Sequence, residues 1–65
     1  MIILTWCARV KKRLTLIELS EKTGISVSAL DDYENLKRFP RIDKLELIAK
    51  ALECRITDLF DSEYK

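Results

Sequence analysis

The sequence predicts an all-α fold, a single compact bundle of five short helices that covers residues 1–65. Three observations lead to this prediction. Hydrophobic residues make up 48% of the chain, with one glycine and one proline, a composition typical of a compact helical domain and not of a disordered tail. Apolar residues recur at helical spacing in several segments. Two of these segments also begin with strong capping signals.

The first helix is expected over residues 2–13. Its apolar and small residues recur at helical spacing: Ile2, Ile3, Trp6, Cys7 and Val10. Ala8 and Arg9 also fall partly on the inner face, which leaves the register of this helix open. The cations Lys11, Lys12 and Arg13 then crowd the end of the segment, where positive charge favours a helix C-terminus.

The second helix is expected over residues 16–23. Thr15 and Glu18 have the spacing of a capping box, in which each side chain bonds to the backbone amide of the other residue. Leu14 and Leu19 flank the cap and form a candidate hydrophobic staple. Gly24 is expected to end the helix, because glycine readily adopts the left-handed conformation of a C-cap.

The third helix is expected over residues 27–35, with Ser26 as its N-cap and with Ile25 and Leu30 as its staple. Leu30 and Tyr33 share a face that should point at the core. The opposite face should point to solvent or to a ligand, and it carries Ser28, Asp32 and Asn35, with Val27 and Asp31 at its edges.

A polar and basic connector follows at residues 35–41, where Pro40 forbids a continuous helix. The fourth helix is expected over residues 42–52, with a weak start at Pro40 or Arg41. Its apolar residues recur at helical spacing: Ile42, Leu45, Ile48, Ala49 and Leu52. A last short helix over residues 56–61 should offer Ile56, Leu59 and Phe60 to the core.

The charge is nearly balanced at +1, but it is unevenly distributed along the chain. Residues 1–25 carry +3, residues 26–36 carry −3, residues 37–44 carry +3 and residues 45–65 carry −2. Two basic segments therefore bracket an acidic middle and could hold phosphates from both sides. The alternative is that these charges are only solvated helix faces.

Cys7 and Cys54 are far apart in the sequence, and the chain has no histidine, which excludes the usual zinc ligand sets. Two buried, reduced thiols are expected, with a single disulfide left open. The apolar start of the chain is too short to span a membrane, and its cations follow the apolar run, the reverse of a signal peptide. A soluble, cytoplasmic protein is expected.

Several stretches together resemble the lambda Cro and repressor-type (XRE-like) helix-turn-helix family. They are LTxxELSEKTGIS at residues 14–26, SxxxLxxYEN at 26–35, Pro40, LxLIAKAL at 45–52 and ITDLF at 56–60. Small Ser20, then Gly24 and then Leu30 also have the spacing of the family. Ser20 lets the two helices approach closely, Gly24 makes the turn, and Leu30 fills the angle between the helices.

The resemblance implies a five-helix bundle whose helix-turn-helix is formed by residues 16–35. It also implies a structural ion pair between Arg9 of the first helix and Glu34 near the end of the third. The loop glycine of the family is replaced by Leu36, so either Leu36 adopts a strained φ or the loop takes another path.

The resemblance further implies that residues 27–35 enter the major groove of double-stranded DNA. Phosphate contacts would come from the start of the second helix and from the loop 37–41. Leu16 stands where the family usually has glutamine, and the helix 27–35 offers aspartates where the family usually presents polar or basic residues. The candidate DNA-binding residues are Thr15, Leu16, Ser26, Val27, Ser28, Asp32, Asn35, Lys37, Arg38 and Arg41.

The leading hypothesis is therefore a sequence-specific transcriptional regulator, a small repressor that binds a two-fold-related DNA site as a homodimer. The C-terminal helix, with Phe60 and Tyr64, is the expected dimer surface. The alternative is a protein-interaction module that kept the fold and lost DNA readout, which the acidic outer face favours. No enzymatic activity, cofactor, metal, membrane contact or small-molecule ligand is expected, since the chain lacks histidine and any phosphate-cradling glycine loop.

Overall fold

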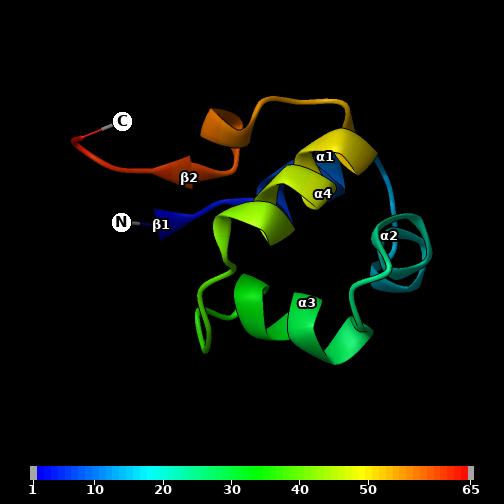
Figure 1. Cartoon of the computed structure of the whole chain (residues 1–65). Coiled ribbons are helices and arrows are strands. Elements are labelled where there is room, and N and C mark those ends of the chain that lie inside the picture. Colours follow the sequence, from blue (N-terminus) through cyan, green and yellow to red (C-terminus); the bar gives the residue numbers. More distant parts are fainter. Residues whose placement is uncertain (1, 65) are drawn as a thin grey trace.

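Four α-helices and a short two-stranded ribbon make up the fold of the described residues, 2–64 (Figure 1). The computed structural model describes residues 2–64. In chain order the elements are β1 (Ile2–Ile3), α1 (Thr5–Lys11), α2 (Leu16–Thr23), α3 (Val27–Glu34), α4 (Ile42–Leu52), the 3-10 turn η1 (Ile56–Asp58) and β2 (Phe60–Asp61). Both α3 and α4 pack against α1 and α2, so the four helices enclose one core. Within residues 2–64, no helix is both long enough and apolar enough to cross a membrane.

The two ends of the chain differ from the predicted all-α, five-helix bundle. Residues 2–3 do not begin the first helix but form β1, which pairs antiparallel with β2 in the register Ile2 with Asp61 and Ile3 with Phe60. The fifth helix, expected over 56–61, is only the turn η1 followed by β2. The β-branched pair Ile2–Ile3 favours extended backbone once a partner strand is available. The Leu4 amide continues the pairing by donating to the Leu59 carbonyl at 2.8 Å.

The caps of α2 and α3 are those that the sequence predicts. The Thr15 hydroxyl accepts from the Glu18 amide at 3.1 Å, and the Glu18 carboxylate accepts from the Thr15 amide at 3.0 Å. Gly24 ends α2 at a φ of +75°. The Ser26 hydroxyl then accepts from the Ala29 amide at 3.1 Å. Both helix starts therefore satisfy donors that would otherwise lack a partner within the helix.

The core lies between the four helices and the C-terminal segment. It consists of Leu19, Ile25, Ala29, Leu30, Tyr33, Leu45, Ile48, Ala49, Leu52 and Leu59. The prediction for Ile42 was wrong, because this side chain is 68% exposed at the start of α4. The N-cap of α4 is Arg41, whose side chain makes no capping hydrogen bond, as its weak start signal indicated.

Helix α1 faces the core with a different side from the one that its apolar spacing predicts. Trp6 and Val10 point outward with 52% and 45% of their surface exposed, while Thr5 is buried. Arg9 lies on the partly buried side of the helix. Because Arg9 bonds to Glu34 of α3, the orientation of α1 follows that ion pair and not its apolar stripe.

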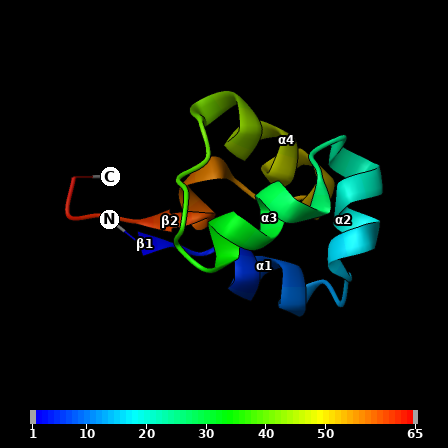
Figure 2. The same ribbon diagram turned by 90° about the horizontal axis from the view of Figure 1, so that it is seen from below.

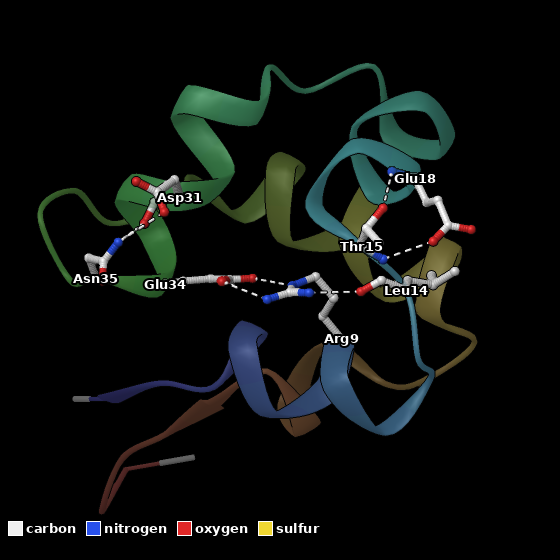
Figure 3. Close-up of polar contacts among 7 residues, drawn as sticks. All are labelled: Arg9, Leu14, Thr15, Glu18, Asp31, Glu34 and Asn35. Carbon is white, nitrogen blue, oxygen red and sulfur yellow. Dashed lines mark hydrogen bonds and ion pairs between the residues drawn. The ribbon is translucent and has the colours of Figure 1, made fainter.

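The ion pair joins α1 to the end of α3 and is well shielded from solvent (Figure 3). Arg9 Nε donates to Glu34 Oε2 at 2.6 Å and Nη2 donates to Oε1 at 3.1 Å, a bidentate arrangement. Arg9 Nη1 also donates to the Leu14 carbonyl at 2.7 Å. The two side chains are only 14% and 7% exposed. Hydrogen bonding to Glu34 raises the pKa of Arg9, so the guanidinium stays protonated.

The connector after α3 contains a strained backbone position at Leu36, where φ is +59°. Of the two alternatives left by the missing loop glycine, the strained φ is therefore the one that the chain adopts. A left-handed conformation costs a non-glycine residue roughly 1–2 kcal/mol. The Leu36 side chain is half exposed and offsets little of this cost by burial.

Replacing Leu36 with glycine should therefore raise the free energy of unfolding by about 0.5–1 kcal/mol, because the relief of strain exceeds the extra entropy of a glycine in the unfolded chain. Urea unfolding followed by circular dichroism measures the change. Gly24→Ala is the matched control. It should destabilise the domain by about 1 kcal/mol through backbone strain alone, since an added Cβ would meet no atom within 4 Å. A destabilised Leu36→Gly variant would contradict the prediction.

The two cysteines are both free thiols, so the disulfide that the sequence left open is absent. Cys54 is partly buried, but Cys7 is exposed, and the expectation of two buried thiols was wrong for Cys7. Both border a hollow of about 420 Å³ between α1 and the segment that follows α4. Partial burial, reinforced by the charge of Asp58, raises the pKa of Cys54, although Lys12 opposes the shift.

Cys54 should consequently react with a disulfide reagent several-fold more slowly than Cys7 at neutral pH. A raised pKa leaves less thiolate at a given pH, so the rate for Cys54 should rise only at a higher pH than for an ordinary exposed thiol. The absorbance released by an aromatic disulfide, recorded over a pH series for Cys7→Ala and Cys54→Ala, separates the two sites. Equal rates at the two sites across the series would refute this assignment.

Candidate nucleic-acid interface

Hydrogen bonds around the turn that joins α2 and α3 hold the angle between the two helices. The Ser20 hydroxyl donates to the Ile25 carbonyl at 2.6 Å, and the Ile25 amide donates to the Thr23 hydroxyl at 3.1 Å. Leu30 of α3 is 1% exposed and lies in one core cluster with Leu19 of α2. In Figure 2, which looks from below, α3 crosses the centre of the molecule and no other element lies in front of it. The turn therefore leaves one side of α3 open to solvent.

The outward side of α3 carries the residues that the sequence predicted for it. Ser26, Val27, Ser28, Asp31 and Asn35 are exposed. Asn35 Nδ2 donates to the Asp31 carbonyl at 2.9 Å and to its Oδ1 at 3.1 Å, so Asn35 is held against its own helix (Figure 3). The Ser26 hydroxyl is likewise engaged as the helix cap. Val27 and Ser28 are thus the least engaged of these side chains in the described contacts.

The Asp32 carboxylate is paired with a cation, because the Arg38 side chain from the connector lies beside it. Arg38 Nε is 3.3 Å from Asp32 Oδ2, and the Arg38 guanidinium also lies 5.8 Å from the centre of the Tyr33 ring. The Lys37 amide donates to the Asp32 carbonyl at 2.9 Å. The pair is partly exposed, so it contributes little to stability. Its effect is electrostatic, since Arg38 neutralises the carboxylate on the outward face.

The start of α2 is less open to an anion than the sequence suggested. The capping box places the Glu18 carboxylate on the Thr15 amide. That hydrogen bond lowers the pKa of Glu18, which therefore stays ionised and adds a negative charge at this helix end. The Leu16 side chain is half-buried and packs against the core. The neighbouring Ile17 is 65% exposed instead.

A basic hollow of about 380 Å³ lies beside the N-terminus of α3. We call its three cations, Arg38, Arg41 and Lys44, the basic cluster. Arg41 lies 3.5 Å from Asp43, but both side chains are highly exposed and this contact is weak. Lys44 was not among the DNA-binding residues predicted from the sequence, although it falls inside the basic segment 37–44. Its position in the first turn of α4 places it at the hollow. Lys37 is exposed and does not line this hollow.

The comparisons with known proteins agree with this geometry. A family model described as Helix-turn-helix matches residues 8–59. The SPbeta prophage-derived uncharacterized HTH-type transcriptional regulator YopS of Bacillus subtilis (strain 168) is 42% identical over 52 residues, which are 78% of this chain and 70% of that protein. The uncharacterized HTH-type transcriptional regulator YozG of the same organism is 38% identical over 52 residues, 78% of this chain and 62% of that protein. No solved structure matches the chain.

The matched residues include the whole of α2, α3 and α4 and the turns between them. They also include Arg9 and Glu34, the pair that orients α1. The family is a non-enzymatic one that binds DNA. The chain therefore belongs to the XRE-type helix-turn-helix family of DNA-binding transcriptional regulators.

Proposed function

We propose that this chain is a sequence-specific repressor that binds double-stranded DNA as a homodimer, with α3 in the major groove. The observation that carries the proposal is the position of the basic cluster directly beside the exposed start of α3. A helix that enters the groove brings the adjoining phosphates close to its ends, and cations there fix its register on the duplex.

Phosphate binding falls mainly to the basic cluster. Arg38, Arg41 and Lys44 come from the connector and the first turn of α4, so one phosphate backbone can run past all three. Lys37 is exposed on the same connector and adds to the positive field. The start of α2 contributes less, because the Glu18 carboxylate repels an anion that approaches the backbone amides there. Phosphate binding is therefore strongest on the α3–α4 side of the helix-turn-helix.

Base readout falls to the first turns of α3. Val27 is 39% exposed and suits contact with a thymine methyl group, while the Ser28 hydroxyl can donate or accept. Asp32 can accept from cytosine N4. Its pairing with Arg38 keeps the carboxylate from repelling the nearby phosphates, which makes an acidic side chain tolerable on this face. Asn35 is held by Asp31 and acts at the margin of the contact.

Two copies would give the domain enough contacts for specific binding, because each α3 is only eight residues long. Two recognition helices one helical turn apart read a two-fold-related site. Repression follows from binding alone, since a domain seated in the groove at a promoter blocks access to that DNA. The proposal places this binding in the cytoplasm.

In vitro selection from random duplexes tests the proposal directly. Wild-type protein should enrich a sequence with two-fold symmetry, and its affinity should fall steeply as salt rises. If titration at low salt detects no binding to random or selected duplexes, the proposed function fails. The alternative, in which the outer face of α3 contacts another protein, would then be favoured.

Asp32→Asn should change which sequence the selection enriches, because an amide both donates and accepts where a carboxylate only accepts. It should also release Arg38 from its ion pair and strengthen binding to all duplexes by a few-fold. Asp43→Asn is the matched control, because Asp43 also forms an ion pair with an arginine, Arg41, but lies on α4 and not on α3. An unchanged enriched sequence for Asp32→Asn would exclude Asp32 from base readout.

A further inference from the structure

The outward side of α1 carries an apolar surface that no element within residues 2–64 covers. Trp6 and Val10 lie one helical turn apart with 52% and 45% of their surface exposed, and Cys7 is exposed beside them. We call these three residues the α1 face. On its other side α1 packs against α3 and α4. In Figure 2 it lies along one edge of the molecule, with no element outside it.

We propose that the α1 face is the two-fold interface between two copies of this chain, with the two α1 helices antiparallel. The inference rests on the proposed homodimer and assigns its surface. Ala8 is the central residue of α1. An antiparallel pair centred there brings Trp6 of each copy against Val10 of the other, which is the reciprocal pairing that a two-fold interface requires. Trp is also the residue type most enriched at the energetic centres of interfaces.

Charge complementarity favours a second copy as the occupant. The C-terminal end of α1 leads into three cations, Lys11, Lys12 and Arg13. Its N-terminal end adjoins the segment 60–63, because β1 pairs with β2 in the register Ile2 with Asp61. That segment carries two carboxylates, Asp61 and Glu63, and no cation. When the helices run antiparallel, the basic end of each copy faces the acidic end of the other.

The spacing of the recognition helices is compatible with this arrangement. Helix α1 packs directly on α3, so a line from α3 of one copy to α3 of the other crosses three helix contacts. Packed helices lie roughly 8–10 Å apart, so three such contacts on one line separate the two copies of α3 by roughly 24–30 Å. This is close to the roughly 34 Å between successive major grooves on one side of B-DNA.

The first test measures self-association by sedimentation velocity from submicromolar to high micromolar concentration. Wild-type protein should dimerise, and Trp6→Gln/Val10→Gln should weaken the dimer by roughly tenfold or more. Leu47→Gln, an exposed apolar residue on α4, is the matched control and should leave the dimer unchanged. The variants replace exposed side chains, and circular dichroism checks that they fold. A monomeric wild-type protein, or a double variant that dimerises like wild type, would overturn the proposal.

The second test uses intrinsic probes on the same surface. Trp6 is the only tryptophan, so its emission should shift to shorter wavelength as concentration rises and the indole leaves water. A short bis-maleimide should link two copies of Cys54→Ala through Cys7, and it should not link Cys7→Ala. Emission that is independent of concentration while the protein dimerises would place the interface elsewhere. Loss of the dimer in Tyr64→Gln alone, with the α1 variant unaffected, would move it to the C-terminal end.

Selection from random duplexes separates this inference from the proposed function. Trp6→Gln/Val10→Gln should enrich single half-sites with weaker affinity, where wild type enriches symmetric pairs. If the wild-type protein binds no DNA but loses its dimer through the α1 variants, the interface stands and the proposed function fails. If it binds symmetric DNA and the α1 variants do so equally well, the interface is wrong and the function stands.

Discussion

Glu34→Ala should leave most of the domain unfolded at room temperature. The substitution strands the Arg9 guanidinium in a site where its side chain is 14% exposed, and removing one partner of a buried ion pair costs about 3–5 kcal/mol. A domain of this size is rarely more stable than about 3–5 kcal/mol in total. Circular dichroism at increasing urea should show a loss of the folded baseline, and the reciprocal Arg9→Ala should behave similarly.

The matched control removes both charges at once. Arg9→Met/Glu34→Leu fills the same space with apolar side chains and leaves no unpaired charge, so it should be markedly more stable than either single variant. The pair would then be a device that orients α1, with little net stabilisation of its own. If the single variants lose less than about 1 kcal/mol, as surface substitutions do, the pair is not buried in the way the contacts indicate.

The second large effect is expected at the basic cluster. Arg38→Gln/Arg41→Gln/Lys44→Gln should weaken binding to every duplex, whatever its sequence, by roughly two orders of magnitude or more at moderate salt. The slope of log K against log salt should fall by about 0.9 for each phosphate contact that is lost. Fluorescence anisotropy with a selected and a scrambled duplex, over a salt series, measures both quantities.

Lys50→Gln is the control for this prediction, because Lys50 carries the same charge on the exposed last turn of α4, away from the hollow. It should change affinity only slightly. A triple variant that discriminates worse between the two duplexes, with an unchanged salt slope, would mean that the cluster reads bases. If the triple variant and the Lys50 variant lose the same affinity per charge removed, DNA binding depends only on net charge.

Much of the helix-turn-helix could be predicted from the sequence because its signals are local. The capping box of Thr15 and Glu18, the cap at Ser26 and the left-handed Gly24 all act within three or four residues, and the structure contains each of them. Leu30 and Tyr33 are buried, and the outward residues of α3 are exposed or partly exposed, because a helix of known start fixes which positions share a face. The Arg9–Glu34 pair was predicted by resemblance to the family and not by local pattern.

The candidate interface was only partly predictable. Lys44 joins the basic cluster because α4 begins at Ile42 and turns that side chain toward the hollow. The contact between Asp32 and Arg38 changes how the acidic face should be interpreted, since an aspartate that appeared to repel DNA is paired. The Leu16 side chain, by contrast, packs against the core and is not among the outward side chains. The positions of Lys44 and Arg38 depend on where the connector passes, which no short sequence pattern specifies.

The sequence by itself determined the caps, the turn and, apart from Ile42, the buried faces of α3 and α4, since these follow from interactions between near neighbours in the chain. Only the tertiary structure decided the two ends. Residues 2–3 became a strand because residues 60–61, from the opposite end of the chain, lie beside them. The apolar stripe of α1 points outward because the other side of the helix carries Arg9, which bonds to Glu34. A buried charge without a partner costs more free energy than the exposure of Trp6 and Val10.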